Sequence, residues 1–221
     1  MDRRGFLKRA GLASAVGGAA VLKGRDLVRA QGQHAIHTMK HGGHGAVGEV
    51  DHARNGFDPT DMLTDFDGGE VSKDRSGRTV REYEFLAVAK DIEVAPGIFF
   101  PAWTYNGRVP GPTIRATEGD RIRIKFVNST EHPHTMHFHG IHPAAMDGVP
   151  GQGEAKSGEE FVYDFIAEPF GTHHYHCHSV PLAQHIHRGL YGAFIVDPKK
   201  GRPDANEMVV VMNAFDTNFD G

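Results

Sequence analysis

The 221-residue chain has little of several features that would place it in a common class. Its single cysteine, Cys177, excludes an internal disulfide and a cysteine-rich zinc finger. A formal net charge of −4 provides no basic excess for a nucleic-acid partner. After the N-terminal region, no run approaches the about 18 consecutive apolar residues of a membrane span. No long segment has the 3.6-residue apolar period of a helix, so we expect a strand-rich protein.

Histidine is the residue that the chain has in excess, with 16 copies. The stretch "GTHHYHCHSVPLAQHIHRGLYG", residues 171–192, places six of them around Cys177. A lone thiol is buried and inert, reactive, or bound to a metal. Because imidazoles lie on both sides of it, the pattern favours a metal.

The first thirty residues predict the compartment. Arg3 and Arg4 precede Phe6, Leu7 and a short, glycine-rich apolar run, an order typical of a twin-arginine export signal over residues 1–30. A basic amphipathic helix is the alternative. We therefore expect a periplasmic or secreted mature protein with no membrane span.

The region that follows is expected to be an extension and then a folded domain. Residues 31–78 are rich in His, Gly and Asp without a steady period, which predicts a disordered, flexible extension. Its histidines either collect metal ions loosely or are simply solvated. Residues 79–200 contain short strands such as "GDRIRIKFVN", in which apolar and charged residues alternate, and these predict one β-sandwich. Residues 201–221 are expected to be a linker and the first strand of a second domain, which would make the chain a fragment.

Strand geometry assigns the histidines to two sides of the sheet. Successive side chains of a strand point to opposite faces, so His176 and His178 share one face and Cys177 lies on the other. In "HPHTMHFHG", His137 and His139 share a face and His134 has the opposite parity. If the two strands are neighbours, His134 joins Cys177, and the two His-X-His pairs meet on the other side.

Two metal sites follow from this arrangement. The first combines the Cys177 thiolate, the His134 imidazole and an imidazole from the loop after the cysteine. A soft thiolate with two imidazoles is the type-1 copper donor set, which is suited to one-electron transfer. The second site consists of imidazoles alone, from His137, His139, His176 and His178, and suits several copper ions.

The chain resembles the cupredoxin domains of multicopper oxidases, especially two-domain laccase-like proteins related to copper nitrite reductases. The matching segments are "YNGRVPGPTIRATEGDRIRIKFVN" (105–128), "HTMHFHGIHPAAMDGVPG" (134–151) and "GTHHYHCHSVPLAQHIHRGLYGAFIVDP" (171–198). The resemblance implies an all-β fold, a cupredoxin-like Greek-key β-sandwich over residues 79–200.

The resemblance also implies specific copper ligands. The resemblance assigns the type-1 copper ligands to His134, Cys177 and His185. His185 is chosen because in this family the loop histidine stands five residues before the axial position. His187 is the alternative to His185. Leu190 occupies the axial position where many relatives have methionine, and it cannot coordinate, which would raise the reduction potential.

A copper-dependent oxidoreductase is the function that the resemblance implies. A small-molecule or metal-ion donor, or a small redox protein, reduces type-1 copper near the exposed edge of His185. Electrons pass through Cys177 to His176 and His178 and to a type-2/type-3 trinuclear cluster that reduces dioxygen to water. This domain offers half of the cluster's eight histidines, so a second domain or subunit, normally in a homotrimer, supplies the rest. Asp147 either serves the cluster as a proton carrier or histidine partner, or is a plain turn residue.

Three other functions fit parts of the pattern. Copper nitrite reductases have an aspartate at the position of His137 and no histidine at that of His178, so this sequence departs from them at both positions. A copper electron carrier would bind one copper ion and consume neither dioxygen nor nitrite. A zinc- or nickel-binding β-sandwich is the third alternative, and a single cysteine between two histidines does not favour it.

Overall fold

The computed structural model describes residues 47–218. The expected export signal, the first part of the expected extension and its histidines at positions 34, 37, 41 and 44 lie outside the described residues. Within residues 47–218, no helix is long and apolar enough to cross a membrane.

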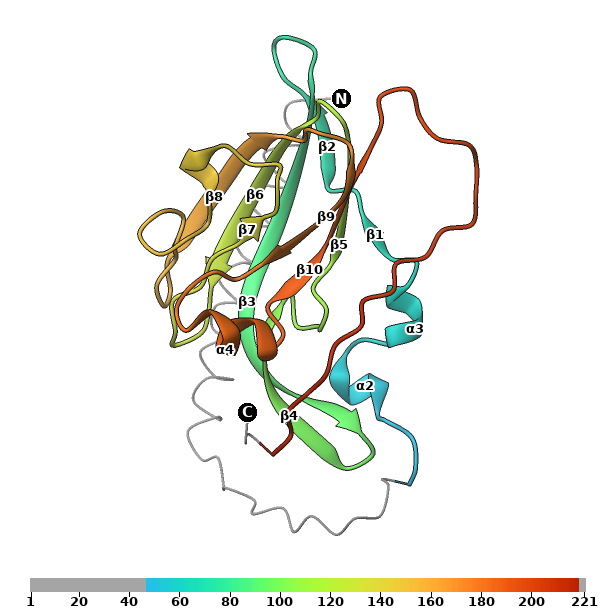
Figure 1. Ribbon diagram of the computed structural model, residues 1–221, viewed down its shortest axis with the longest axis vertical. Helices are drawn as coiled ribbons and strands as arrows, with labels where there is room; N and C mark the ends of the chain where they lie inside the picture. Colours follow the sequence, from blue (N-terminus) through green and yellow to red (C-terminus); the bar gives the residue numbers. More distant parts are fainter. Residues whose placement is uncertain (1–46, 219–221) are drawn as a thin grey trace, which may run out of the picture. The chain divides into compact units, whose positions relative to one another are not determined.

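Strands dominate the fold and form two sheets (Figure 1). The first sheet has the order β1-β5-β10-β9-β7, and the second has β2-β3-β6-β8, with β4 paired to β3. The strands are β1 (Phe66–Asp67), β2 (Glu70–Lys73), β3 (Thr79–Ala95), β4 (Ile98–Tyr105), β5 (Thr113–Thr117), β6 (Arg121–Asn128), β7 (His137–Phe138), β8 (Glu160–Ile166), β9 (Gly171–His176) and β10 (Tyr191–Asp197). Short helices are α2 (His52–Asn55), α3 (Pro59–Met62), α4 (Leu182–His187) and the 3₁₀ turn η1 (Ala144–Met146). The predicted all-β sandwich is confirmed.

The alternating pattern of β6 sets which of its faces meets the core. Ile122, Ile124 and Phe126 are completely buried, whereas the basic residues between them reach solvent. Arg121 and Arg123 pair with Asp164 of the neighbouring strand β8. One face therefore contributes apolar burial, and the other is a charged, hydrated surface.

Aromatic side chains fill the space between the sheets and fix β9, the strand that ends just before the cysteine. The ring of Tyr175, on β9, packs edge-on against Phe85 of the other sheet with centroids 5.7 Å apart. Its hydroxyl donates to the Pro112 carbonyl at 2.6 Å. A Cβ added at Gly111 would lie 2.6 Å from that hydroxyl oxygen, so the "PGP" turn needs glycine there. The turn thereby fixes the position of β9 just before His176.

The prediction of a flexible extension over residues 31–78 is wrong for the second half of that range. Residues 52–73 form α2, α3, β1 and β2. Asp51 and Asp58 cap the two helices with their carboxylates. β1 pairs with β5, and β2 pairs with β3. Elements of two to four residues are too short to show a hydrophobic period, and their stability comes from pairing with strands farther along the chain.

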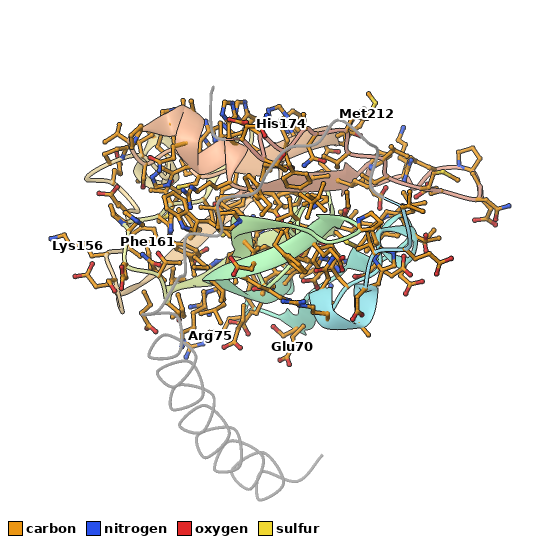
Figure 2. The ribbon with its side chains drawn as sticks, turned by 90° about the horizontal axis from the view of Figure 1, so that it is seen from below. Glu70, Arg75, Lys156, Phe161, His174 and Met212 are labelled. Atoms are coloured by element: carbon orange, nitrogen blue, oxygen red, sulfur yellow. The ribbon has the colours of Figure 1, made fainter. Side chains whose placement is uncertain are left out.

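The C-terminal segment also differs from expectation. Residues 201–217 contain no strand. Met208, Val210 and Met212 are exposed, and Met212 lies at the surface in Figure 2. The backbone amide of Val209 donates to the Leu63 carbonyl at 2.9 Å, but no strand ladder forms there. The expected strand is therefore wrong for this chain, because an alternating pattern forms a strand only where another strand pairs with it.

Candidate metal centres

The end of β9 sends successive side chains to opposite sides. Tyr175 and Cys177 are completely buried, whereas His176 and His178 are half-buried. β7 lies beside β9 in antiparallel pairing, with His137 opposite His176. The split of faces that the sequence predicted is therefore present, and the pairing of the two strands, on which the prediction of two sites depended, is observed.

His134, Cys177 and His185 form a compact buried cluster, which we call the thiol cluster. The Nδ1 atoms of His134 and His185 are 3.0 Å apart. The Cys177 Sγ lies 3.1 Å from Nδ1 of His185 and 3.7 Å from Nδ1 of His134. The three exposed fractions are 0%, 0% and 2%, so the donor atoms are shielded from water.

His134 and Cys177 are positioned by backbone contacts between distant segments. His134 exchanges two backbone hydrogen bonds with Ala155, at 3.0 and 2.9 Å. The backbone amide of Thr135 donates to Sγ of Cys177 at 3.4 Å. The Thr135 hydroxyl accepts from the His178 amide at 2.7 Å, which ties the segment before β7 to the residue after the cysteine.

The third member of the thiol cluster comes from α4. His185 points into the core, whereas His187 is exposed. Two residues along a helix are separated by about 200°, so the two rings face opposite sides. The structure therefore brings His185 and not His187 to the cysteine. The expected exposed edge of His185 is wrong, because the residue is only 2% exposed and its ring packs against that of Trp103.

Burial sets the protonation of the thiol cluster. Loss of hydration, with a smaller contribution from neighbouring histidines, lowers the pKa of His134 from 6.5 to about 3. Burial likewise lowers the pKa of His185 to about 4. Burial raises the pKa of the Cys177 thiol, against hydrogen bonds from Thr135 and Ser179. Both imidazoles are therefore neutral at pH 7, with lone pairs available, and a metal must displace the thiol proton.

The donor set fits a copper ion. Two neutral Nδ1 atoms and a sulfur face one another at 3.0 to 3.7 Å, the spacing of atoms that share one metal ion through bonds of about 2.0–2.3 Å. The Nε2 atom of His134 is buried without a hydrogen-bond partner among the described residues. Leu190, completely buried, accepts from the Cys177 amide and donates to the His185 carbonyl through its backbone. Its side chain offers no donor atom, so His134, Cys177 and His185 are the residues that would hold the copper ion.

A second cluster, the imidazole cluster, lies on the other side of β9. Single ring nitrogens of His137, His139 and His176 lie within 4.8 Å of one another. The Nε2 atoms of His139 and His176 are 2.7 Å apart. Burial, followed by neighbouring histidines, lowers the pKa of His139 to about 4 and lowers that of His176. The ring of His178 is 5.0 Å from that of His137 but falls outside this close group.

Asp147 supports the imidazole cluster. Nδ1 of His137 donates to the Asp147 carbonyl at 2.6 Å and lies 3.1 Å from its carboxylate. This contact fixes the ring and leaves Nε2 free, as is common for a metal-binding imidazole. Gly148 has a φ of +67°, and an added Cβ would lie 2.0 Å from the Met136 carbonyl. The "MDG" turn therefore needs glycine to bring Asp147 to His137.

Sequence reasoning missed three residues beside the clusters. Trp103, on β4, lies against both imidazoles of the thiol cluster. Nε2 of His142 is 3.4 Å from the Asp147 carboxylate. His174, exposed at the surface in Figure 2, stacks on His139 with ring centroids 3.9 Å apart. Strand parity gave a signal for His174, which shares a face with His176, but nothing in the sequence linked Trp103 to a histidine.

Comparisons with known proteins agree with this donor set. The family model described as multicopper oxidase matches residues 89–201. A solved structure described as a multicopper oxidase is 57% identical, with a TM-score of 0.75, over 78% of this chain and 61% of its own. A copper-containing nitrite reductase of Neisseria meningitidis is 35% identical over 133 residues, 59% of this chain and 34% of that protein. Copper resistance protein A of Escherichia coli is 38% identical over 123 residues, 53% of this chain and 20% of that protein.

The fold and the donor set define a copper-binding protein of the cupredoxin type, a Greek-key sandwich as expected. The chain belongs to the multicopper oxidase family, and copper is its cofactor. It spans between a fifth and a third of the two curated relatives named above.

Proposed function

We propose that this chain provides the electron-accepting copper site and half of the oxygen-reducing site of a laccase-like oxidase. The observation that carries the proposal is the position of Cys177. Its sulfur belongs to the buried thiol cluster, while His176, its covalent neighbour, belongs to the imidazole cluster across the strand. Copper bound at the two clusters supplies one-electron transfer and binding of the electron acceptor.

The protein's own residues keep the proposed sites in register. Thr135 donates to the cysteine sulfur and also accepts from the His178 amide, so it contacts the backbones that support both clusters. Burial holds His134, His185 and His139 in their neutral, metal-binding form at pH 7. Asp147 orients His137 and supplies a carboxylate beside the imidazole cluster, where protons are consumed.

The proposed oxygen site requires more imidazoles than residues 47–218 bring together. Four histidines, His137, His139, His176 and His178, would be half of a trinuclear cluster's ligands. We propose that a second cupredoxin domain of a neighbouring subunit supplies the other half in a homotrimer, since a site split between domains needs a partner. We also propose export by residues 1–30 and a periplasmic or secreted location. The donor would be a phenol, a metal ion or a small redox protein.

Nitrite reduction is the second candidate, because a nitrite reductase is among the relatives. The histidine at position 137 is evidence against nitrite reduction. This ring lies with His139 and His176 where nitrite reductases are expected to have an aspartate, so the pocket has an additional imidazole.

The test uses the natural protein that contains this chain, loaded with copper and given an electron donor. We expect an intense blue colour, a mass three times that of the protomer, and consumption of dioxygen without hydrogen peroxide release. His176→Ala should retain the colour and lose oxygen uptake. Nitric oxide formed from nitrite, without oxygen uptake, would establish a nitrite reductase. One blue copper ion per chain with neither reaction would indicate an electron carrier.

A further inference from the structure

The members of the thiol cluster are closed to direct contact with an electron donor. His134 and Cys177 have no exposed surface, and His185 has 2%. A donor in solution must therefore pass its electron through a residue that covers the cluster. Such a residue needs to touch a ligand ring on one side and be reachable from solvent on the other.

Trp103 touches both ligand rings of the thiol cluster. Its ring centroid is 5.1 Å from that of His134 and 4.8 Å from that of His185, with interplanar angles near 60° in both pairs. The indole is only 5% exposed. The guanidinium of Arg188 lies 4.8 Å from the ring centroid and covers part of it. Trp103 is also the only tryptophan in the chain.

His132 provides the outer contact of this path. It is exposed, and its ring centroid is 4.7 Å from that of Trp103. The backbone around it is fixed, because the His132 carbonyl accepts from the Asn128 side chain at 2.6 Å and from the Thr130 hydroxyl at 3.0 Å. His132, Trp103 and His185 thus form a continuous row of aromatic rings from solvent to the cluster, with centroid spacings of 4.7 and 4.8 Å.

We propose that this row, the His132–Trp103 relay, is the path by which external donors reduce the copper bound at the thiol cluster. The inference rests on the proposed type-1 site and names the surface at which that site receives electrons. The two residues act through the ligand rings and do not bind the metal. Electronic coupling through contacting π systems declines far less than through a gap of the same length, so loss of either ring slows electron transfer.

The redox step balances with a simple probe. Hexaammineruthenium(II) loses one electron and becomes ruthenium(III), and the bound copper(II) gains that electron and becomes copper(I). No bond breaks and no proton moves. The progress of the step is the loss of the blue colour, followed by stopped flow in the absence of dioxygen and nitrite.

Four variants test the relay in the copper-loaded protein. Trp103→Leu removes the ring, and Trp103→Phe keeps a smaller one. His132→Ala removes the exposed ring, and His132→Phe restores an aromatic ring that has no metal-binding atom. His187→Ala is the matched control, since it removes an exposed histidine of α4 that has no ring contact to Trp103 among the described residues.

We expect Trp103→Leu to slow bleaching by about tenfold, equivalent to about 1.4 kcal/mol of activation free energy, with an unchanged absorption spectrum and potential. His132→Ala should slow it by a smaller factor. The phenylalanine variants should recover most of the rate, and His187→Ala should bleach at the wild-type rate.

Three results would overturn the relay. Equal bleaching rates in wild type, Trp103→Leu and His132→Ala would show that electrons enter elsewhere. A slower rate matched by a changed spectrum or potential in each variant would assign both rings a structural role. Wild-type protein that takes up copper without a blue colour would instead remove the proposed type-1 site, and the relay with it. Failure to consume dioxygen leaves the bleaching assay unaffected, so that failure concerns the oxidase proposal alone.

Discussion

The buried imidazoles of the thiol cluster should make the metal-free protein sensitive to acid. His134 and His185 titrate near pH 6.5 when unfolded, but burial lowers their pKa to about 3 and about 4 in the folded chain. Between these values the unfolded state binds protons that the folded state does not. Stability therefore increases with pH through this window and is lost as pH falls below 6.5.

The size of the effect follows from the difference in proton binding. At pH 5, above both folded-state pKa values, each ring is neutral in the native protein and charged after unfolding. The separation is 6.5 − 5, or 1.5 pH units, taking the unfolded value as 6.5. At about 1.4 kcal/mol per unit, each ring lowers the free energy of unfolding at pH 5 by about 2 kcal/mol, and the pair lowers it by about 4 kcal/mol. That is a large part of the 5–15 kcal/mol, roughly, by which a domain is stable.

Urea unfolding of the metal-free protein at pH 8 and pH 5 measures this loss. Other groups contribute to the wild-type change, so the informative quantity is the difference from a variant. His134→Gln and His185→Gln should each lose about 2 kcal/mol less than wild type on acidification. His187→Gln, at an exposed position of α4, is the matched control. If the Gln variants lose as much stability as wild type, the two rings are not held neutral by burial. The conclusion that both imidazoles are ready to bind a metal at pH 7 is then wrong.

Four further predictions concern single residues near the clusters. Cys177→Ser should abolish the blue colour and turnover while circular dichroism shows an unchanged fold; activity retained without colour would place the electron path elsewhere. Copper loading should quench the fluorescence of Trp103, whose ring lies about 5 Å from both ligand rings, and much less so in Cys177→Ser; equal quenching in both would mean that copper binds elsewhere. Leu190→Met should lower the copper potential measured by redox titration, because a thioether stabilises the oxidised ion; an unchanged or higher potential would show that residue 190 is not axial. Gly148→Ala should lower the free energy of unfolding by about 1–3 kcal/mol or more, since its φ is +67° and the added Cβ meets the Met136 carbonyl; a neutral effect in urea unfolding would contradict this.

Local geometry carried much of the prediction of the clusters. A strand alternates its side chains whatever surrounds it, so the separation of Cys177 from His176 followed from their adjacency alone. The alternation of Ile122, Ile124 and Phe126 likewise indicated a strand with one buried face, as the structure has it. The pairing of β7 with β9 was a condition that the sequence could state but not decide.

The loop histidine shows where local reasoning stops. Strand parity does not apply to α4, and a helical turn separates His185 from His187 by about 200°. Only the packing of α4 over the core determines which ring faces the cysteine. The same packing buries His185, for which the resemblance implied an exposed edge.

By itself, the sequence determined the residue chemistry of this protein: one thiol among imidazoles, on strands whose period fixes opposite faces. The tertiary structure alone decided what covers that chemistry. Trp103 lies 74 positions before Cys177, and residues 52–73 join strands that follow them in the chain. Contacts of this kind depend on how distant segments pack, which no short-range pattern encodes, because their stability comes from burial and strand pairing in the completed fold.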